Sequence, residues 1–84
     1  MKIVFTSHFK KAFKKLSHKN QEDFFNKLEV LKVDMNHSQL RMHRLHGAMK
    51  DFFAFSLNYS VRVVFQYDQN SIYLYDIGSH KIYN

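Results

Sequence analysis

Residues 52–77, FFAFSLNYSVRVVFQYDQNSIYLYDI, decide the fold that is predicted for this chain. Apolar and polar side chains alternate along most of this stretch, as they do in strands that bury one face. Two short polar segments, residues 58–60 and 68–70, interrupt the alternation and predict turns. Successive strands joined by turns this short pair antiparallel. The stretch therefore predicts three strands in an antiparallel meander, the last of them running from 71 to 77.

The residues that precede the meander predict one strand and two helices. Residues 2–6 are rich in β-branched and aromatic side chains, which favour a short strand. Apolar side chains then recur at helical spacing in the segments 8–18 and 20–35. They are Phe9, Ala12, Phe13 and Leu16 in the first segment, and Phe24, Leu28, Leu31 and Met35 in the second. Ser7 and Asn20 are the expected N-caps of the two helices.

The predicted order of elements is β-α-α-β-β-β in a single domain that spans residues 1–84. Residues 36–43 are polar and are expected to form a loop. The predicted fold is α+β, with a helical hairpin packed on one face of a twisted antiparallel sheet. On the covered face of the sheet we expect Val61, Val63 and Phe65. The opposite face is expected to be an open, mixed surface for nucleic acid or protein, carrying Arg62, Val64 and Gln66 with Phe52, Ala54 and Ser56.

The net charge of +6 is concentrated in two places. Residues 1–20 contain six lysines and no acidic residue, and a second basic cluster comprises Arg41, Arg44 and Lys50. Patches of this kind favour a polyanionic partner such as RNA, DNA or the ribosome. An acidic protein would satisfy the same field, and a solvated lysine face without a partner is the other alternative.

Composition argues against several other classes of protein. The chain has no cysteine, which rules out a disulfide scaffold and a Cys-rich zinc site. No apolar run approaches the ~20 residues that span a bilayer. Lysines interrupt the N-terminal segment where a signal peptide would be apolar. We therefore expect a cytoplasmic protein with no membrane partner.

Four motifs occur along the chain in an order that is typical of one superfamily. They are a strand followed by Ser7, Phe9 and a lysine-rich helix, then residues 43–47 (HRLHG) with Lys50, then residues 59–65 (YSVRVVF), and finally Gly78, Ser79 and His80 with Tyr83. With these motifs the chain resembles the RelE/ParE superfamily of toxins from toxin–antitoxin systems. The Gly-Ser-His ending is similar to that of the YafQ-like branch.

The resemblance implies a fold, an activity and partners. It implies a metal-free endoribonuclease that needs no cofactor and cleaves mRNA, usually on the ribosome. It also implies a cognate antitoxin as protein partner. Two alternatives stay open: a ParE-like inhibitor of DNA gyrase that cleaves nothing, and a decayed toxin that folds and binds its antitoxin without activity.

Metal-free RNA cleavage needs a base for the 2′-hydroxyl proton, an acid for the departing 5′-oxygen, and a cation for the crowded phosphorane. The 2′-hydroxyl attacks its own adjacent phosphate, so the enzyme supplies alignment, proton transfer and charge. His80 is the leading general acid or base, because imidazole titrates near pH ~6.5. We expect Gly78 to allow a turn that projects His80 beyond the sheet. Arg62 is the preferred phosphate-binding cation, because a guanidinium group is always charged.

Five further residues are candidates, each with an alternative role. His43 matches a functional His of the YafQ-like branch, and His46 is its rival as the second proton-transfer group. Either could instead be a loop residue held by a backbone carbonyl, and without a carboxylate or Cys nearby in sequence the two do not predict a metal site. Lys50 and Arg44 are expected to contact phosphates. Tyr83 is expected either to stack on a base or to fold back onto the sheet.

The chain departs from the YafQ-like pattern at three places. Ser56 stands where a second strand His is expected, and Ser60 stands where an Asp is expected. Tyr83 lies three positions after His80, whereas many members have four. The first two departures leave the identity of the general base open, and they keep the decayed toxin among the alternatives.

Overall fold

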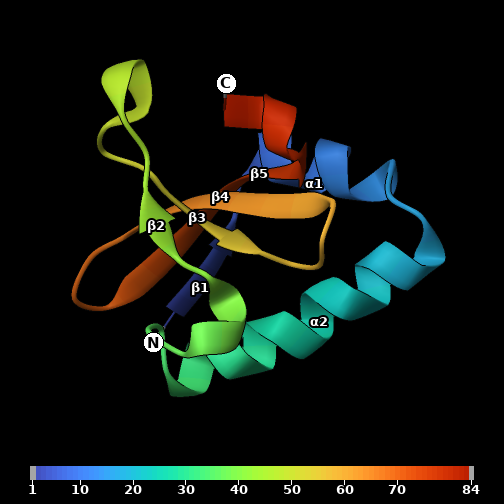
Figure 1. Ribbon diagram of the computed structural model, residues 1–84, viewed down its shortest axis with the longest axis horizontal. Helices are drawn as coiled ribbons and strands as arrows, with labels where there is room; N and C mark the ends of the chain where they lie inside the picture. The colour runs from blue at the N-terminus through green and yellow to red at the C-terminus, as the bar shows by residue number, and fades with distance from the viewer. Residues whose placement is uncertain (1, 84) are drawn as a thin grey trace.

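The computed structural model describes residues 2–83, apart from the side chains of His80 and Tyr83. Within this part of the chain the helices and strands are β1 (Lys2–Phe5), α1 (Ser7–Lys14), α2 (His18–Val33), β2 (His43–Arg44), β3 (Phe53–Ser56), β4 (Val61–Tyr67) and β5 (Ser71–Ser79) (Figure 1). Three short 3₁₀ turns are also present: η1 (Ser38–Leu40), η2 (Gly47–Met49) and η3 (His80–Tyr83). The predicted order is confirmed, with one short strand added before the meander.

The five strands form one sheet in the spatial order β1-β5-β4-β3-β2. β3, β4 and β5 are antiparallel neighbours, which confirms the meander, and β2 adds antiparallel to β3. β1 instead lies parallel to β5, with Lys2 opposite Ser71 and Phe5 opposite Leu74. The sheet as a whole is therefore mixed. Sequence patterning could not give the direction of β1, because a helical hairpin and not a tight turn separates this strand from the others.

β2 lies at the end of the segment that was expected to be a loop. It contains only His43 and Arg44, which pair with Ala54 and Phe53 of β3. Two residues are too few to display a period of two, so this strand has no signature in the sequence. The loop itself is shorter than expected, because residues 38–40 form η1.

α1 begins one residue earlier, and α2 two residues earlier, than the sequence indicates. Thr6, not Ser7, is the N-cap of α1, since its Oγ1 accepts a hydrogen bond from the Phe9 amide at 3.1 Å. Ser17, not Asn20, caps α2 in the same way, by accepting from the amide of Asn20 at 3.2 Å. Hydroxyl and amide side chains stand close together at both boundaries, and only backbone geometry decides which of them acts as the cap. No described helix has the length and apolar character needed to cross a membrane.

The main core lies between the helices and the sheet. Its buried members include Phe9 from α1, Phe24, Leu28 and Leu31 from α2, and Phe55, Val61, Val63, Phe65, Ile72, Leu74 and Ile77 from the sheet. Phe24 is central to this core, because its ring lies 5.3 Å from that of Phe9 and 5.4 Å from that of Phe13. The predicted apolar faces of both helices and of β4 are thereby confirmed.

The opposite face of the sheet is less open than expected. Leu45, Ala54 and Val64 form a second, small buried cluster there. Met49, Phe52 and Ile82 pack against the cluster from η2, the segment after it, and η3. The expectation of an open face is therefore wrong at its centre, because the short turns on either side of the meander fold over it. Alternation along a strand assigns side chains to a face but does not reveal which turn covers that face.

Candidate nucleic-acid site

The strand register brings His43, Ser56 and Arg62 to the same face of the sheet. His43 lies opposite Ala54, which lies opposite Val64, and these two define the face away from the helices. Ser56 lies opposite Arg62 in the next row. Residues two apart on a strand point to the same side, so His43 and Arg62 share this face although 19 positions separate them.

A cleft of about 320 Å³ lies beside Arg62 at the turn between β3 and β4. Arg41 and Lys27 line the cleft together with Arg62, and no carboxylate is among its described lining residues. The Ser56 and Tyr59 side chains add two hydroxyl groups. Three cations without a lining carboxylate create a positive field that suits a phosphate group.

Backbone carbonyl groups hold the guanidinium of Arg62 at this turn. Its Nη1 donates to the carbonyl oxygens of Asn58 at 2.9 Å, Tyr59 at 3.0 Å and Val61 at 3.3 Å. Carbonyl groups carry no net charge, so they fix the orientation of the guanidinium without neutralising it. The side chain of Arg62 is half-buried, and its position depends on the conformation of the turn.

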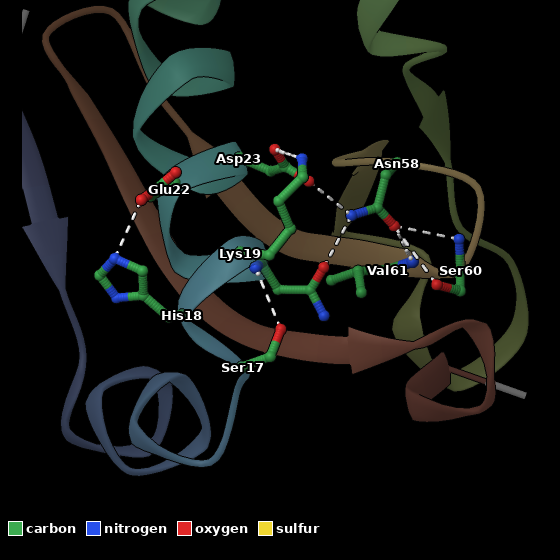
Figure 2. Close-up of polar contacts among 9 residues, drawn as sticks. Ser17, His18, Lys19, Glu22, Asp23, Asn58, Ser60 and Val61 are labelled. Atoms are coloured by element: carbon green, nitrogen blue, oxygen red, sulfur yellow. Dashed lines mark hydrogen bonds and ion pairs between the residues drawn. The ribbon is translucent and has the colours of Figure 1, made fainter.

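Asn58 fixes that turn to α2, as Figure 2 shows. Its Nδ2 donates to Asn20 Oδ1 at 2.9 Å and to Asp23 Oδ2 at 3.0 Å. Its Oδ1 accepts from the amides of Ser60 and Val61 at 3.1 and 3.0 Å. The pKa of Asp23 is lowered, first by its hydrogen bond with Lys19 and then by the one with Asn58. The helix side of the molecule thus determines where the candidate cation Arg62 is held.

The C-terminal turn η3 starts next to Arg62. Gly78 lies opposite Arg62 and Ser79 lies opposite Val61, so His80 follows directly at this end of the sheet. The side chains of His80 and Tyr83 lie outside the described residues, so their predicted roles stay predictions. Their backbone forms a 3₁₀ turn immediately after β5, as expected.

The structure corrects the reason for Gly78. This residue lies within β5, and among the described glycines only Gly47 has a positive φ, at 67°. A Cβ on Gly78 would lie 2.8 Å from Cγ2 of Ile82. Gly78 is therefore required for the close approach of η3 to the sheet, and not for a left-handed turn.

The other sequence candidates lie on and after β2. His43 is exposed, and its Nδ1 lies 3.3 Å from the carbonyl oxygen of Arg41. Arg44 pairs with Phe53, which faces the helices, so Arg44 points away from the face that carries His43. Arg44 Nε donates to the Lys50 carbonyl at 2.9 Å and thereby closes the loop between them.

His46 and Lys50 flank η2, where His46 is the N-cap and Lys50 the C-cap. Both side chains are exposed. The structure therefore assembles His43, Arg62 and the η3 turn at one face, and it leaves Arg44, His46 and Lys50 around the 44–50 loop.

Sequence reasoning did not select Arg41 and Lys27 as site residues. Arg41 belongs to the second basic cluster, and its positive φ of 48° directs the chain into β2. Lys27 lies on α2, and its Nζ donates to the Gln39 carbonyl at 3.4 Å. Nothing in the sequence pairs Lys27 with residues 41 and 62, because their proximity arises only from packing. The described residues contain no group of three His, Cys, Asp or Glu side chains that could bind a metal ion.

Comparison with known proteins identifies the family of the chain. A family model described as the bacterial toxin of a type II toxin–antitoxin system, YafQ, matches residues 1–83. The chain belongs to the YafQ toxin family. It is therefore the toxin component of a type II toxin–antitoxin system. No curated protein sequence matches the chain.

Solved structures show that the fold of the YafQ family is shared beyond the family itself. YafQ from E. coli strain BL21(DE3) is 12% identical, with a TM-score of 0.74 over 95% of this chain and 93% of that chain. A YoeB/ParE toxin from Agrobacterium tumefaciens is 14% identical, with a TM-score of 0.80 over 95% and 99%. A copper-bound mutant toxin from Helicobacter pylori is 21% identical, with a TM-score of 0.73 over 98% and 97%. At these identities the likeness concerns the fold alone.

Proposed function

We propose that this YafQ-family toxin is an endoribonuclease that cleaves mRNA on the ribosome without a metal ion. The observation that supports the proposal best is the meeting of His43, Arg62 and the start of η3 on one sheet face. A cationic cleft adjoins this face, as RNA binding requires. The resemblance of the Gly-Ser-His ending to the nuclease branch supports the same activity.

In the proposed mechanism the 2′-hydroxyl attacks the adjacent phosphate and expels the 5′-oxygen. One imidazole accepts the 2′-hydroxyl proton and a second donates a proton to the leaving oxygen. We assign these two roles to His80 and His43, since β2 carries His43 to the face of Arg62. His46 stays the rival of His43. Arg62 stabilises the phosphorane, because its charge is held in place before the reaction begins.

The remaining candidates serve binding in this proposal. Lys50 and Arg44 contact phosphates at the 44–50 loop, and Tyr83 stacks on a base. A cognate antitoxin neutralises the toxin in the cytoplasm. This part is supported by the YoeB–YefM complex from Staphylococcus aureus, whose chain is 15% identical to this one, with a TM-score of 0.78 over 95% of this chain and 97% of that one.

The substitution His80→Ala tests the proposal. Loss of a general acid or base lowers rates by about 10²–10⁴-fold, so growth arrest on induction and cleavage of mRNA by purified toxin should both fall by that factor. His18→Ala is the matched control, because His18 is exposed on α2 and pairs only with Glu22 among the described residues. Cleavage by the wild type should persist in EDTA. His43→Ala and His46→Ala compared side by side identify the second proton-transfer group.

Four outcomes would contradict the proposal. If His80→Ala leaves cleavage unchanged, or if EDTA abolishes cleavage by the wild type, the proposed mechanism is wrong. Toxicity that persists in His80→Ala, together with inhibition of DNA supercoiling by the purified protein, indicates a ParE-like gyrase inhibitor. A wild-type chain that neither arrests growth nor cleaves RNA is a decayed toxin.

A further inference from the structure

A second cleft, distant in sequence from the candidates above, lies between α1 and the end of β5. β1 pairs only with residues 71–74, so the outer edge of β5 beyond Leu74 has no neighbouring strand. α1 lies against this part of β5 and leaves a cleft of about 440 Å³ between them. His8 and Lys11 line the cleft from α1 and Lys15 lines it from the C-cap of this helix, whereas Asp76 and Gly78 line it from the strand.

The three basic side chains that line this cleft lie on one face of the helix. Positions 8, 11 and 15 follow the spacing i, i+3, i+7, which places them in one row. Lys11 and Lys15 form no ion pair with any described residue, whereas Lys19 and Lys32 on α2 pair with Asp23 and Glu29. Like charges four positions apart on a helix face repel each other. A bound anion would relieve this repulsion.

Asp76 is the single carboxylate among the described lining residues, and the protein itself occupies both of its oxygens. Oδ1 accepts from the amide of Ile77 at 2.8 Å, and Oδ2 lies 3.2 Å from Nε2 of His8. The side chain of Asp76 is 17% exposed. Asp76 therefore positions His8, and both oxygens of the Asp76 carboxylate have partners within the protein. Lys11 and Lys15 line the solvent-exposed part of the cleft.

A β-bulge in β5 places an aromatic ring against His8 of this cleft. Val64 pairs with Asp76 and Phe65 with Leu74, so Tyr75 is the extra residue on β5. The bulge turns Tyr75 against His8, whose ring stacks on it at 5.3 Å and 14°. The Tyr75 ring also lies 4.9 Å from that of Phe52 and is 39% exposed. His8 lines the cleft and thus connects this exposed ring to the lysines, and basic side chains together with aromatic rings are the combination that binds single-stranded nucleic acid.

We propose that the α1–β5 cleft is a second RNA-binding site, in which Lys11 and Lys15 bind backbone phosphates of the strand whose reacting phosphate lies near Arg62. Gly78 connects the two sites, because it lines the cleft and also lies opposite Arg62. The two sites thus flank β5 on either side. The inference rests on the proposed RNA substrate, but it concerns binding and not cleavage.

The test compares two double variants of the same helix. K11A/K15A removes both cleft lysines, and K10A/K14A removes two lysines that line a different, phenylalanine-rich groove. The two variants have equal net charge. Binding of a 2′-O-methylated single-stranded RNA, which cannot be cleaved, is measured by fluorescence anisotropy at several salt concentrations. For K11A/K15A the slope of log K against log [salt] should become shallower by about 1.4, and binding near 0.1 M salt should weaken about tenfold or more. K10A/K14A should retain the wild-type slope.

Three results of the binding experiment would overturn the inference. They are an unchanged slope in K11A/K15A, an equal change of slope in both variants, and a wild type that does not bind this RNA, and each would show that the cleft is not a specific RNA-binding site. Weakened binding of a polyglutamate peptide with unaffected RNA binding reassigns the cleft to a protein partner. Cleavage of unmodified RNA is measured in parallel. Cleft-dependent binding without cleavage would overturn the proposed nuclease alone, whereas cleavage without cleft-dependent binding would overturn this inference alone.

Discussion

The two faces of the sheet differ in how they are covered. The helix side buries a continuous cluster in which Phe9, Phe24, Phe55 and Phe65 are at most 2% exposed. Among the described residues, the buried apolar cluster on the opposite side comprises Leu45, Ala54 and Val64, beneath turns that contribute Met49, Phe52 and Ile82. Apolar burial stabilises a protein by roughly 25 cal/mol per Å², so most of the stability comes from the helix side. The other face can therefore carry the polar side chains of a site at small cost to the fold.

Substitutions at two neighbouring positions of β4 test this comparison with the largest expected effect. Phe65 faces the helices and Val64 faces the turns, and both are fully buried. Phe65→Ala should lower the free energy of unfolding by about 3–5 kcal/mol, because it removes a ring and leaves a cavity. Val64→Ala should cost about 2 kcal/mol, since it removes two methyl-sized groups at ~0.8 kcal/mol each and leaves a smaller void. Urea denaturation followed by circular dichroism measures both.

Equal losses from the two substitutions would contradict the view that one face dominates stability. Ribonuclease activity provides a second readout that separates folding from function. Phe65→Ala should reduce activity only as far as it reduces the folded fraction, because Phe65 lies on the face opposite to the candidate site.

The connection between the two faces comes next in expected size. Asn58→Ala removes two hydrogen bonds to α2 and three within the turn that holds Arg62. A hydrogen-bonding group left unsatisfied costs about 1–3 kcal/mol, and thermal unfolding should show a loss in that range. RNA cleavage at a temperature where the variant is fully folded should also fall, because Arg62 loses the fixed carbonyl groups of this turn. Asn26→Ala, at an exposed position of α2, is the control and should change stability by no more than about 0.5 kcal/mol. An Asn58→Ala variant with wild-type cleavage would show that the orientation of Arg62 does not matter.

The smallest effect on stability is expected at Gly78, together with a selective effect on the site. The new Cβ of Gly78→Ala would displace Ile82 and with it η3, at a cost of about 1 kcal/mol. Gly47→Ala should cost about 1–2 kcal/mol through its positive φ, but a Cβ there meets no atom within 4 Å. Cleavage should therefore fall at least about tenfold in Gly78→Ala and stay close to wild type in Gly47→Ala. Comparable activity of the two variants at matched folded fraction would contradict a role for the position of η3.

Much of the fold could be predicted because the relevant information is local. The alternation in residues 61–67 assigns Val63 and Phe65 to the covered face, and the structure agrees. The spacing of Phe24, Leu28 and Leu31 likewise identifies the buried face of α2. The direction of β1 and the existence of β2 could not be predicted, because β1 depends on pairing with a distant segment and β2 is too short to show a period. The choice of Thr6 and Ser17 as caps could not be predicted either, because neighbouring polar side chains compete at each boundary and backbone geometry decides between them.

The candidate site was predicted in its residue types and only partly in its geometry. Residue chemistry and the family resemblance selected Arg62 and His43, and the register of β2, β3 and β4 brings them to one face. The same register turns Arg44 to the other face. The α1–β5 cleft had no signal in the sequence, because a histidine in the first helix and an aspartate in the last strand are unrelated until the chain folds.

The sequence by itself therefore determined both helices and every described strand except β2, together with their apolar faces, the antiparallel meander and the family of the chain. These properties follow from short-range periodicity, turn length and the spacing of motifs, which are visible in the sequence without knowledge of long-range contacts. Only the tertiary structure decided which turns cover the second face, which cations line each cleft, and why Gly78 must lack a side chain. Those outcomes depend on close packing between distant segments, such as Thr6 and Leu74, which are 68 residues apart, and no local pattern records them.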